Sequence, residues 1–263
     1  MDAANPSATP TFASRTPLHI GAIGLIAHDL NGLTNYYREL LGLTVIERSG
    51  TLARLGVGGV TLIEIEQRPS AKPDDPAQAG LYHTAFLMPT RQDHARWIMH
   101  IARNQVPISG ASDHGVSEAF YLDDPEGNGI EVYNDRPRER WNWENGLVTM
   151  PTKQLDIEAI LREVDPATAT YPEAPAGLRI GHVHLRVGNI DKAEQFYRSA
   201  LGLDLTRRRG APASCRQAAT ITMSAPTSGT ATAPGFATAT GRAWPGSRWR
   251  RPTAQPTIPP SPA

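Results

Sequence analysis

A repeat at an offset of 160 residues constrains the fold of this 263-residue chain more than any other feature. One copy reads HIGAIGLIAHDLNGLTNYYRELLGLTVIER over 19–48, and the other reads RIGHVHLRVGNIDKAEQFYRSALGLDLTRR over 179–208. Each copy begins with the alternation of a strand and continues, after a polar turn, with apolar residues at helical spacing. Gly42 and Gly202 stand where the C-cap glycine of that helix is expected. The chain therefore carries the same strand–helix unit twice.

Further strands follow the helix of the first copy. The segments LTVIER, TLARLGV and VTLIEIEQ have strand character and complete a β-α-β-β-β unit. A looser copy fills 81–134, with the strand LYHTAFLMP, a helix through Asp93–Asn104, and the strands AFYLDDP and GIEVYND around the turn DPEGNG. We predict an α+β fold in which paired βαβββ modules form curled mixed sheets.

The repeats and the composition between them divide the chain into parts. The stretch 136–178 is rich in Pro, Trp and charge, and it is predicted to be a linker with one helix, Asp156–Val164. The predicted parts are a disordered N-terminus (1–17), a first domain (18–135), the linker (136–178), the start of a second domain (179–208) and a disordered tail (209–263). The second domain is therefore predicted to be incomplete.

Charge also changes abruptly near Arg208. Residues 1–206 hold 18 basic and 26 acidic side chains, a net charge of −8, whereas residues 207–263 hold eight arginines and no acid. From Gly210 onward the tail has no Leu, Val or Lys. Such a segment cannot bury enough apolar surface to offset its ordering entropy, which indicates disorder.

Composition excludes several classes of protein. The formal net charge of zero argues against a nucleic-acid binder driven by bulk positive charge. No apolar run approaches the roughly 20 residues of a membrane span, and the N-terminus lacks the pattern of a secretory signal. The single cysteine, Cys215, allows no internal disulfide and no cysteine zinc cluster. We expect a cytoplasmic protein with no nucleic-acid or membrane partner.

The motifs resemble a known superfamily. Paired β-α-β-β-β units, with FY-x-x-x-L-G-L after the first strand and DP-x-G-N-x-I-E near the end, resemble the vicinal oxygen chelate superfamily, which includes glyoxalase I, bleomycin-resistance proteins and extradiol dioxygenases. Within it, GLYHTAFLMP, DHGVSEAFYLDDPEGNGIEVYNDRPR and IGHVHLRV resemble the two-domain catechol 2,3-dioxygenase branch. The resemblance covers about residues 18–208.

Strand alternation singles out one carboxylate. Glu131 lies between two apolar residues in GIEVY, so in a strand it shares a face with Gly129 and Tyr133, which we predict to be the inside of a curled sheet. A buried carboxylate is costly unless it is paired or bound to a metal. This favours Glu131 as a metal ligand over a residue on a solvated face.

Three histidines lie on two predicted strands. His83 lies in HTAFL, on the strand that opens the looser copy at 81–134, and by itself it could equally be a core or surface histidine. His182 and His184 are two residues apart on one strand and so face the same side. The resemblance implies that His182 is a metal ligand and that His184 supports the site or is structural. The set His83, Glu131 and His182 matches the facial triad of two histidines and one carboxylate that suits non-haem Fe(II).

Two further residues are implied in catalysis by the resemblance. Tyr121 lies ten residues before Glu131, where extradiol dioxygenases place a tyrosine that hydrogen-bonds the substrate; otherwise it is an ordinary strand aromatic. His114 lies just upstream, where the family keeps an acid–base histidine, and histidine suits proton transfer near neutral pH. His94 and His100, on the predicted helix with two arginines, are predicted to be solvated.

The first repeat departs from the family pattern. Ala22 occupies the position of the opening-strand histidine, and Gly24 corresponds to His184. The first domain thus offers His83 and Glu131 without the opening ligand, which the second domain offers at His182. One solution is a funnel that combines the second half of the first domain with the first half of the second, within one chain or across a dimer.

The resemblance implies extradiol cleavage of a catechol or substituted catechol by O₂, with Fe(II) as the metal and Mn(II), Ni(II) or Zn(II) as alternatives. The sequence leaves the oligomeric state open, with a homo-oligomer as one alternative. A glyoxalase I-like isomerase, which needs no O₂, is one alternative function, and a metal-free binding protein like the bleomycin-resistance group is another. The three candidate ligands argue against the metal-free binder.

The tail itself suggests a frameshift. Read from the third base of each codon, the codons available to Gln217–Met223 permit Gly-Gly-Tyr-His-His-His, which resembles the strand that follows this point in the family. A shift near Arg207–Ala211 would also explain the absence of acids and leucines after it. A natural basic, Pro-rich tail is the alternative. We expect this chain, without the rest of its second domain, to expose the helix face of Phe196 and Leu201 and to be poorly soluble or inactive.

Overall fold

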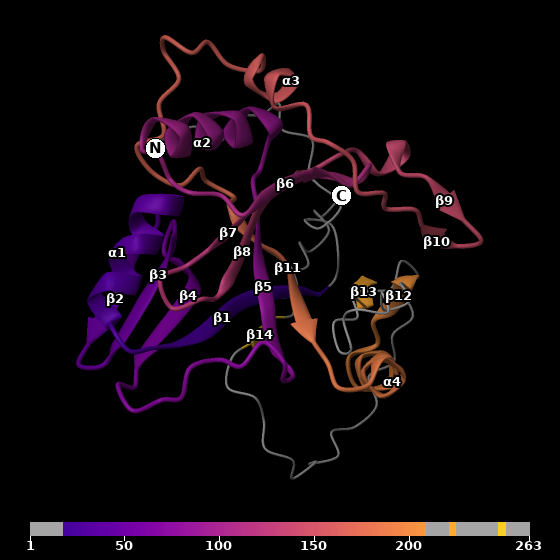
Figure 1. The fold of residues 1–263 in the computed structure, drawn as a ribbon, viewed down its shortest axis with the longest axis horizontal. Helices are drawn as coiled ribbons and strands as arrows, with labels where there is room; N and C mark the ends of the chain where they lie inside the picture. The colour runs from indigo at the N-terminus through magenta and orange to yellow at the C-terminus, as the bar shows by residue number, and fades with distance from the viewer. Residues whose placement is uncertain (1–17, 209–220, 225–246, 251–263) are drawn as a thin grey trace, which may run out of the picture.

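Figure 1 shows two curled sheets with helices against them, in a computed structural model that describes residues 18–208, 221–224 and 247–250. The strands of the first sheet, in spatial order, are β14 (Ser247–Arg250), β1 (His19–Ala27), β4 (Val60–Gln67), β3 (Leu52–Val57) and β2 (Thr44–Ser49). Those of the second are β11 (Arg179–Arg186), β5 (Gly80–Leu87), β8 (Gly129–Asp135), β7 (Ser117–Asp123) and β6 (Gly110–Asp113). The predicted α+β fold of curled mixed sheets is confirmed.

The remaining elements are helices and short strand pairs. The α-helices are α1 (Leu30–Leu41), α2 (Arg91–Arg103), α3 (Ile157–Leu161) and α4 (Ile190–Leu201), and a 3-10 helix covers Arg138–Arg140. The short pairs are β9 (Trp143–Glu144) with β10 (Leu147–Val148), and β12 (Asp204–Arg208) with β13 (Ile221–Ser224). No helix among the residues placed by the structure is long and apolar enough to cross a membrane.

Both repeat helices end and begin as their sequences indicate. Gly42 and Gly202 close α1 and α4 with φ values of 69° and 65°, a left-handed conformation that glycine adopts without strain. At the other ends, the Asp29 side chain accepts a hydrogen bond from the amide of Asn31, and that of Asn189 accepts one from Lys192. These bonds satisfy amides that have no partner within the helix.

The two helices differ in what they bury. α1 buries six residues against the sheet, and the Trp97 indole of α2 donates to the Leu40 carbonyl at 2.8 Å, which ties the two modules together. By contrast α4 buries none of its side chains, and Phe196 is 59% exposed. Figure 1 shows α4 beside β12, away from α1 and α2. The predicted exposure of this apolar helix face is confirmed.

The position of strand β11 shows how the second repeat joins the rest of the fold. It pairs antiparallel with β5, so the first strand of the repeat that begins at Arg179 extends the sheet of the second module, whereas β12 of the same repeat pairs with β13 in a separate sheet. Within the tail predicted to be disordered, Ile221–Ser224 and Ser247–Arg250 form strands that pair with β12 and β1. The proposed frameshift region, the rest of the tail and residues 1–17 lie largely or wholly outside the described residues.

Candidate metal centre

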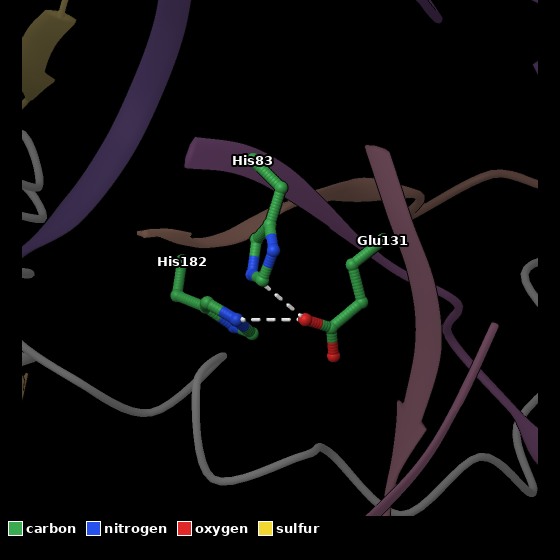
Figure 2. A group of neighbouring side chains, drawn as sticks. All are labelled: His83, Glu131 and His182. Atoms are coloured by element: carbon green, nitrogen blue, oxygen red, sulfur yellow. Dashed lines mark ion pairs between the residues drawn. The ribbon is translucent and has the colours of Figure 1, made fainter. Parts of the chain in front are cut away.

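Three neighbouring strands of the second sheet, β5, β8 and β11, each place one candidate ligand on the same face. Ala85 of β5 pairs with Glu131 of β8 on one side and with His182 of β11 on the other. Residues paired across strands point to the same face, so Glu131 and His182 flank the small Ala85 side chain. His83 lies two residues along β5 and therefore faces the same way. Figure 2 shows the three side chains pointing toward one another.

The three side chains are within reach of a single ion. Glu131 Oε2 lies 3.0 Å from His83 Nε2 and 3.3 Å from His182 Nε2. One candidate ligand atom from each residue can be chosen so that all three lie within 4.8 Å of one another. His83 and Glu131 are 7% and 3% exposed, whereas the His182 side chain keeps 42% of its accessible surface. The cluster is thus buried on the side of β5 and β8 and open on the side of β11.

The protonation of the cluster follows from burial and mutual attraction. Burial raises the pKa of Glu131, but the neighbouring His182 and His83 outweigh it and hold that pKa well below its ordinary value, so the group is a carboxylate. Burial lowers the pKa of His83 and favours its neutral ring, the form that binds metals. For His182, burial alone would lower the pKa, but the Glu131 carboxylate raises it.

An unsatisfied nitrogen indicates that the cluster fits a metal. His83 Nε2 is fully buried, yet it has no well-formed hydrogen bond with any residue that the structure places, although Glu131 is close. A buried polar atom without a partner is costly and calls for an explanation. A cation held by His83, Glu131 and His182 would supply it. Two imidazoles and one carboxylate suit Fe(II), and also Mn(II), Ni(II) or Zn(II).

Space for these side chains depends on close backbone packing. Gly129 of β8 is paired with His83, and a Cβ at Gly129 would lie 2.2 Å from the Tyr82 carbonyl oxygen and 3.0 Å from His83 Cβ. Only glycine fits there. On the other side of His83, the ring of His184 lies 4.8 Å away, between centroids, and 4.7 Å from the ring of Tyr82. Burial and the two histidines nearby lower the pKa of His184 to about 3, so this ring is neutral.

Tyr121 and His114 lie beside the cluster. Tyr121 of β7 is paired with Glu131, which extends the same row by one strand, and its ring centroid is 5.8 Å from that of His83. His114 Nε2 lies 2.7 Å from the Tyr121 hydroxyl, and His114 Nδ1 lies 2.9 Å from the Pro151 carbonyl oxygen. The structure therefore gathers all five residues singled out from the sequence.

These contacts assign the hydrogen of the His114 ring. A carbonyl oxygen can only accept, so Nδ1–H donates to Pro151. With its hydrogen on Nδ1, the His114 ring accepts the Tyr121 hydroxyl proton at Nε2. Burial, with the charge of Glu131, raises the pKa of Tyr121 and keeps it protonated. The lone pairs of the Tyr121 oxygen remain free to accept a hydrogen bond from a bound hydroxyl.

Comparison with known proteins shows the family of the chain. The family described as the glyoxalase/bleomycin resistance protein/dioxygenase superfamily matches residues 19–132 and 179–243. The chain belongs to this superfamily. Its matched residues in the first segment include His83 and Glu131, and those in the second include His182.

Two curated relatives of the chain are named dioxygenases. A protein of Bacillus subtilis named catechol-2,3-dioxygenase is 36% identical over 190 residues, which is 71% of this chain and 66% of that protein. Biphenyl-2,3-diol 1,2-dioxygenase 3 of Rhodococcus globerulus is 28% identical over 137 residues, which is 46% of this chain and 67% of that protein. The chain therefore spans about two thirds of the length of each relative.

A solved glyoxalase/dioxygenase structure from Nostoc punctiforme superposes on 45% of this chain and 91% of its own, with 21% identity and a TM-score of 0.38. This overlap is too low to support an argument about function. The comparisons thus show the superfamily, and the two sequence relatives are named dioxygenases.

Around the cluster, the structure adds residues that the sequence did not indicate. The Tyr133 hydroxyl lies 3.3 Å from His182 Nδ1, although alternation had placed Tyr133 only on the face of Glu131. The Pro151 carbonyl, which contacts His114, comes from the predicted linker and carries no side-chain signal. Only tertiary contact identifies it.

One prediction about a residue of α2 is wrong. His94 is not solvated: it is 0% exposed, and its Nδ1 lies 2.6 Å from Asn134 Oδ1. Burial lowers the pKa of His94 to about 4, so the ring is neutral. The missed signal was helical spacing, since His94, Trp97, Ile98 and Ile101 form a buried stripe of α2. His100 is partly exposed, and its Nε2 contacts the Glu39 carbonyl at 2.7 Å.

Proposed function

We propose that this protein derives from an extradiol dioxygenase that cleaves a catechol or substituted catechol with O₂, using Fe(II) held by His83, Glu131 and His182. The observation that carries this proposal is the buried, unsatisfied His83 Nε2 within a His–Glu–His cluster whose ligand atoms lie within 4.8 Å. The relationship to a protein named catechol-2,3-dioxygenase supports the substrate class. The metal would bring a diol and O₂ together and pass electrons between them.

The residues around the cluster supply proton transfer. A catechol hydroxyl near the cluster would donate to the Tyr121 oxygen, while the Tyr121 hydroxyl donates to His114 Nε2 at 2.7 Å. A proton can therefore leave the substrate through Tyr121 to His114, whose Nδ1–H is held by the Pro151 carbonyl. We assign Tyr121 and His114 as the catalytic acid–base pair on this basis.

The inner face next to the cluster suits a flat apolar ring. Ala85, Leu87, Ala119 and Tyr133 form a small buried apolar group, against which Tyr121 packs. These side chains exclude water next to the polar row, which strengthens the interactions of charges and dipoles there. A catechol has an apolar ring and two adjacent hydroxyls, so its ring suits the apolar group and its hydroxyls suit the His–Glu–His cluster.

An aerobic and an anaerobic assay test the proposal. The full chain, loaded with Fe(II) under anaerobic conditions, is mixed with catechol, and the ring-opened semialdehyde is followed by absorbance before and after O₂ is admitted. We expect the activity that this chain retains to require O₂ and to be lost in Glu131→Gln, which preserves the side-chain volume but removes the charged ligand. Isomerase activity on a hemithioacetal without O₂ would favour a glyoxalase, and tight catechol binding without any metal would favour a binding protein.

The incomplete second repeat bears on how much activity this chain retains. We propose that the tail after Arg208 is translated from a shifted frame, that the region 179–208 begins an interrupted second domain, and that activity is impaired. The exposed Phe196 on α4 supports this, because nothing in the described part of the chain covers that face. The coding DNA decides the matter: an early stop in the shifted frame, or the absence of the Tyr-His-His-His strand, would contradict the frameshift.

A further inference from the structure

The two ring nitrogens of His182 face different partners. Nε2 lies 3.3 Å from Glu131 Oε2, on the side of the proposed metal, and Nδ1 lies 3.3 Å from the Tyr133 hydroxyl. The rings of Tyr133 and His182 are 5.1 Å apart between centroids and are inclined by 61°. The hydroxyl therefore contacts the nitrogen that does not face Glu131.

A glycine makes room for this contact. A Cβ at position 181 would lie 1.9 Å from the Tyr133 hydroxyl oxygen and 2.9 Å from the adjacent ring carbon, both far inside van der Waals distance. Gly181 directly precedes His182 on β11. The backbone next to the proposed ligand is thus shaped so that the Tyr133 hydroxyl can reach the histidine ring.

The Tyr133 hydroxyl has no other hydrogen bond among the residues that the structure describes. Tyr133 is 4% exposed, and a buried tyrosine hydroxyl generally needs a partner. His182, by contrast, is the most exposed of the three proposed ligands.

We propose that Tyr133 is a positioning residue that orients the His182 ring, with Gly181 as the residue that admits its hydroxyl. This inference rests on the proposed metal site. A metal at Nε2 requires the ring hydrogen on Nδ1, which then donates to the Tyr133 oxygen. In the metal-free protein, Nε2 faces Glu131 and Nδ1 faces the Tyr133 hydroxyl. A hydroxyl both donates and accepts, so Tyr133 holds the ring in either state.

Partners of this kind fix the orientation of metal-binding histidines, and their loss typically weakens metal affinity by roughly 10- to 100-fold. The test uses the full metal-free chain titrated with Co(II), followed by calorimetry and by the visible ligand-field bands of the ion. Tyr133→Phe retains the ring and removes only the hydroxyl. We expect its Co(II) dissociation constant to rise roughly 10-fold or more, and the bands to shift because the His182 ring is no longer fixed.

A matched control separates positioning from a loss of stability. Tyr37→Phe also removes one buried tyrosine hydrogen bond, the 2.9 Å bond to Asp124, from a helix outside the cluster. We expect Tyr37→Phe to lower the melting temperature and to leave the Co(II) constant and bands unchanged. In a second variant, Gly181→Ala, the added methyl displaces the hydroxyl, and we expect weaker Co(II) binding as for Tyr133→Phe.

The outcomes distinguish the inference from the proposed site. If wild-type protein binds no Co(II), or binds it equally well after Glu131→Gln, the proposed metal site fails. If wild-type protein binds Co(II) through Glu131 but Tyr133→Phe has the same constant and the same bands, the site stands and the positioning role of Tyr133 is refuted. A Tyr133→Phe variant that only melts earlier, with metal binding unchanged, also refutes it.

Discussion

Replacing Glu118 by Gln tests how the polar groups behind the site stabilise the fold. Glu118 lies on the face of β7 opposite Tyr121 and is only 4% exposed. Its Oε2 accepts from Arg91 Nε at 2.8 Å and from Asn134 Nδ2 at 3.2 Å. Its Oε1 accepts from Arg91 Nη2 and from Arg136 Nη2, both at 3.1 Å.

The magnitude follows from this arrangement. Gln fills the same volume, but one of its two terminal atoms is an amide nitrogen, which would face donors where a carboxylate oxygen accepted two bonds. Two bonds are therefore lost, at least one of them from a guanidinium, and hydrogen bonds to charged groups contribute about 1.5–3 kcal/mol each. We expect the free energy of unfolding to fall by about 3–5 kcal/mol, as for breaking a buried ion pair.

The assay is urea unfolding followed by circular dichroism, with an unchanged m value showing that the change is in stability. Glu163→Gln is the matched control, because Glu163 contacts the same arginine at 2.6 Å but its side chain is 42% exposed. We expect Glu163→Gln to lower the free energy of unfolding by less than about 1 kcal/mol, because that ion pair is exposed. A loss below about 1 kcal/mol for Glu118→Gln, or equal losses for both variants, would refute the reasoning.

The pH dependence supplies a second check on Glu118. Burial raises its pKa, but Arg91 and the other donors outweigh this and lower the pKa below the ordinary 4.5. A group whose pKa is lower in the folded state contributes stability above its unfolded pKa and loses it as pH falls through the folded value. The difference in free energy of unfolding between wild type and Glu118→Gln should therefore reach its maximum by pH 7 and should shrink below about pH 4.

Three further changes test other parts of the structure. Burial lowers the pKa of His94 in the folded state to about 4, below the ordinary 6.5, so the unfolded chain binds the proton first. The free energy of unfolding should therefore fall by about 3 kcal/mol between pH 6.5 and 4, and urea titrations of His94→Gln should lack this loss. Asp124→Ala removes the acceptor of Tyr37 and of the 124–129 turn and should cost about 2–4 kcal/mol by thermal unfolding; an unchanged melting temperature would count against that role. Phe196→Glu should reduce light scattering and alter stability by less than about 0.5 kcal/mol, and persistent aggregation would contradict the exposed-patch explanation.

Local patterns in the sequence were enough to predict the modules. The helices that end at Gly42 and Gly202 follow from apolar spacing and from a residue type that tolerates a left-handed backbone. Strand alternation likewise placed Glu131 and Tyr133 on one buried face. The same reasoning failed at His94, where the nearby arginines were given more weight than the buried stripe to which His94 belongs.

The pairing of β11 with β5 was beyond such reasoning. Ala22 and His182 occupy the same place in the two repeats, and the sequence left open whether His182 meets His83 and Glu131 within one chain or across a dimer. Backbone hydrogen bonds between strands carry almost no sequence signal, so the register of His182 beside Ala85 is visible only in the folded chain. The contact of His114 with a backbone carbonyl is similar in kind.

The sequence by itself determined the repeated β-α-β-β-β modules, the residue types of the candidate metal centre and the break in composition near Arg208, because periodicity, chemistry and composition are local properties of the chain. Only the tertiary structure decided that the second repeat adds its first strand to the sheet of the second module, that a buried nitrogen of His83 has no hydrogen bond within the described part of the chain, and that Tyr133 reaches His182 past Gly181. Those facts depend on strand order and on distances of a few ångströms between distant segments, which no local pattern specifies.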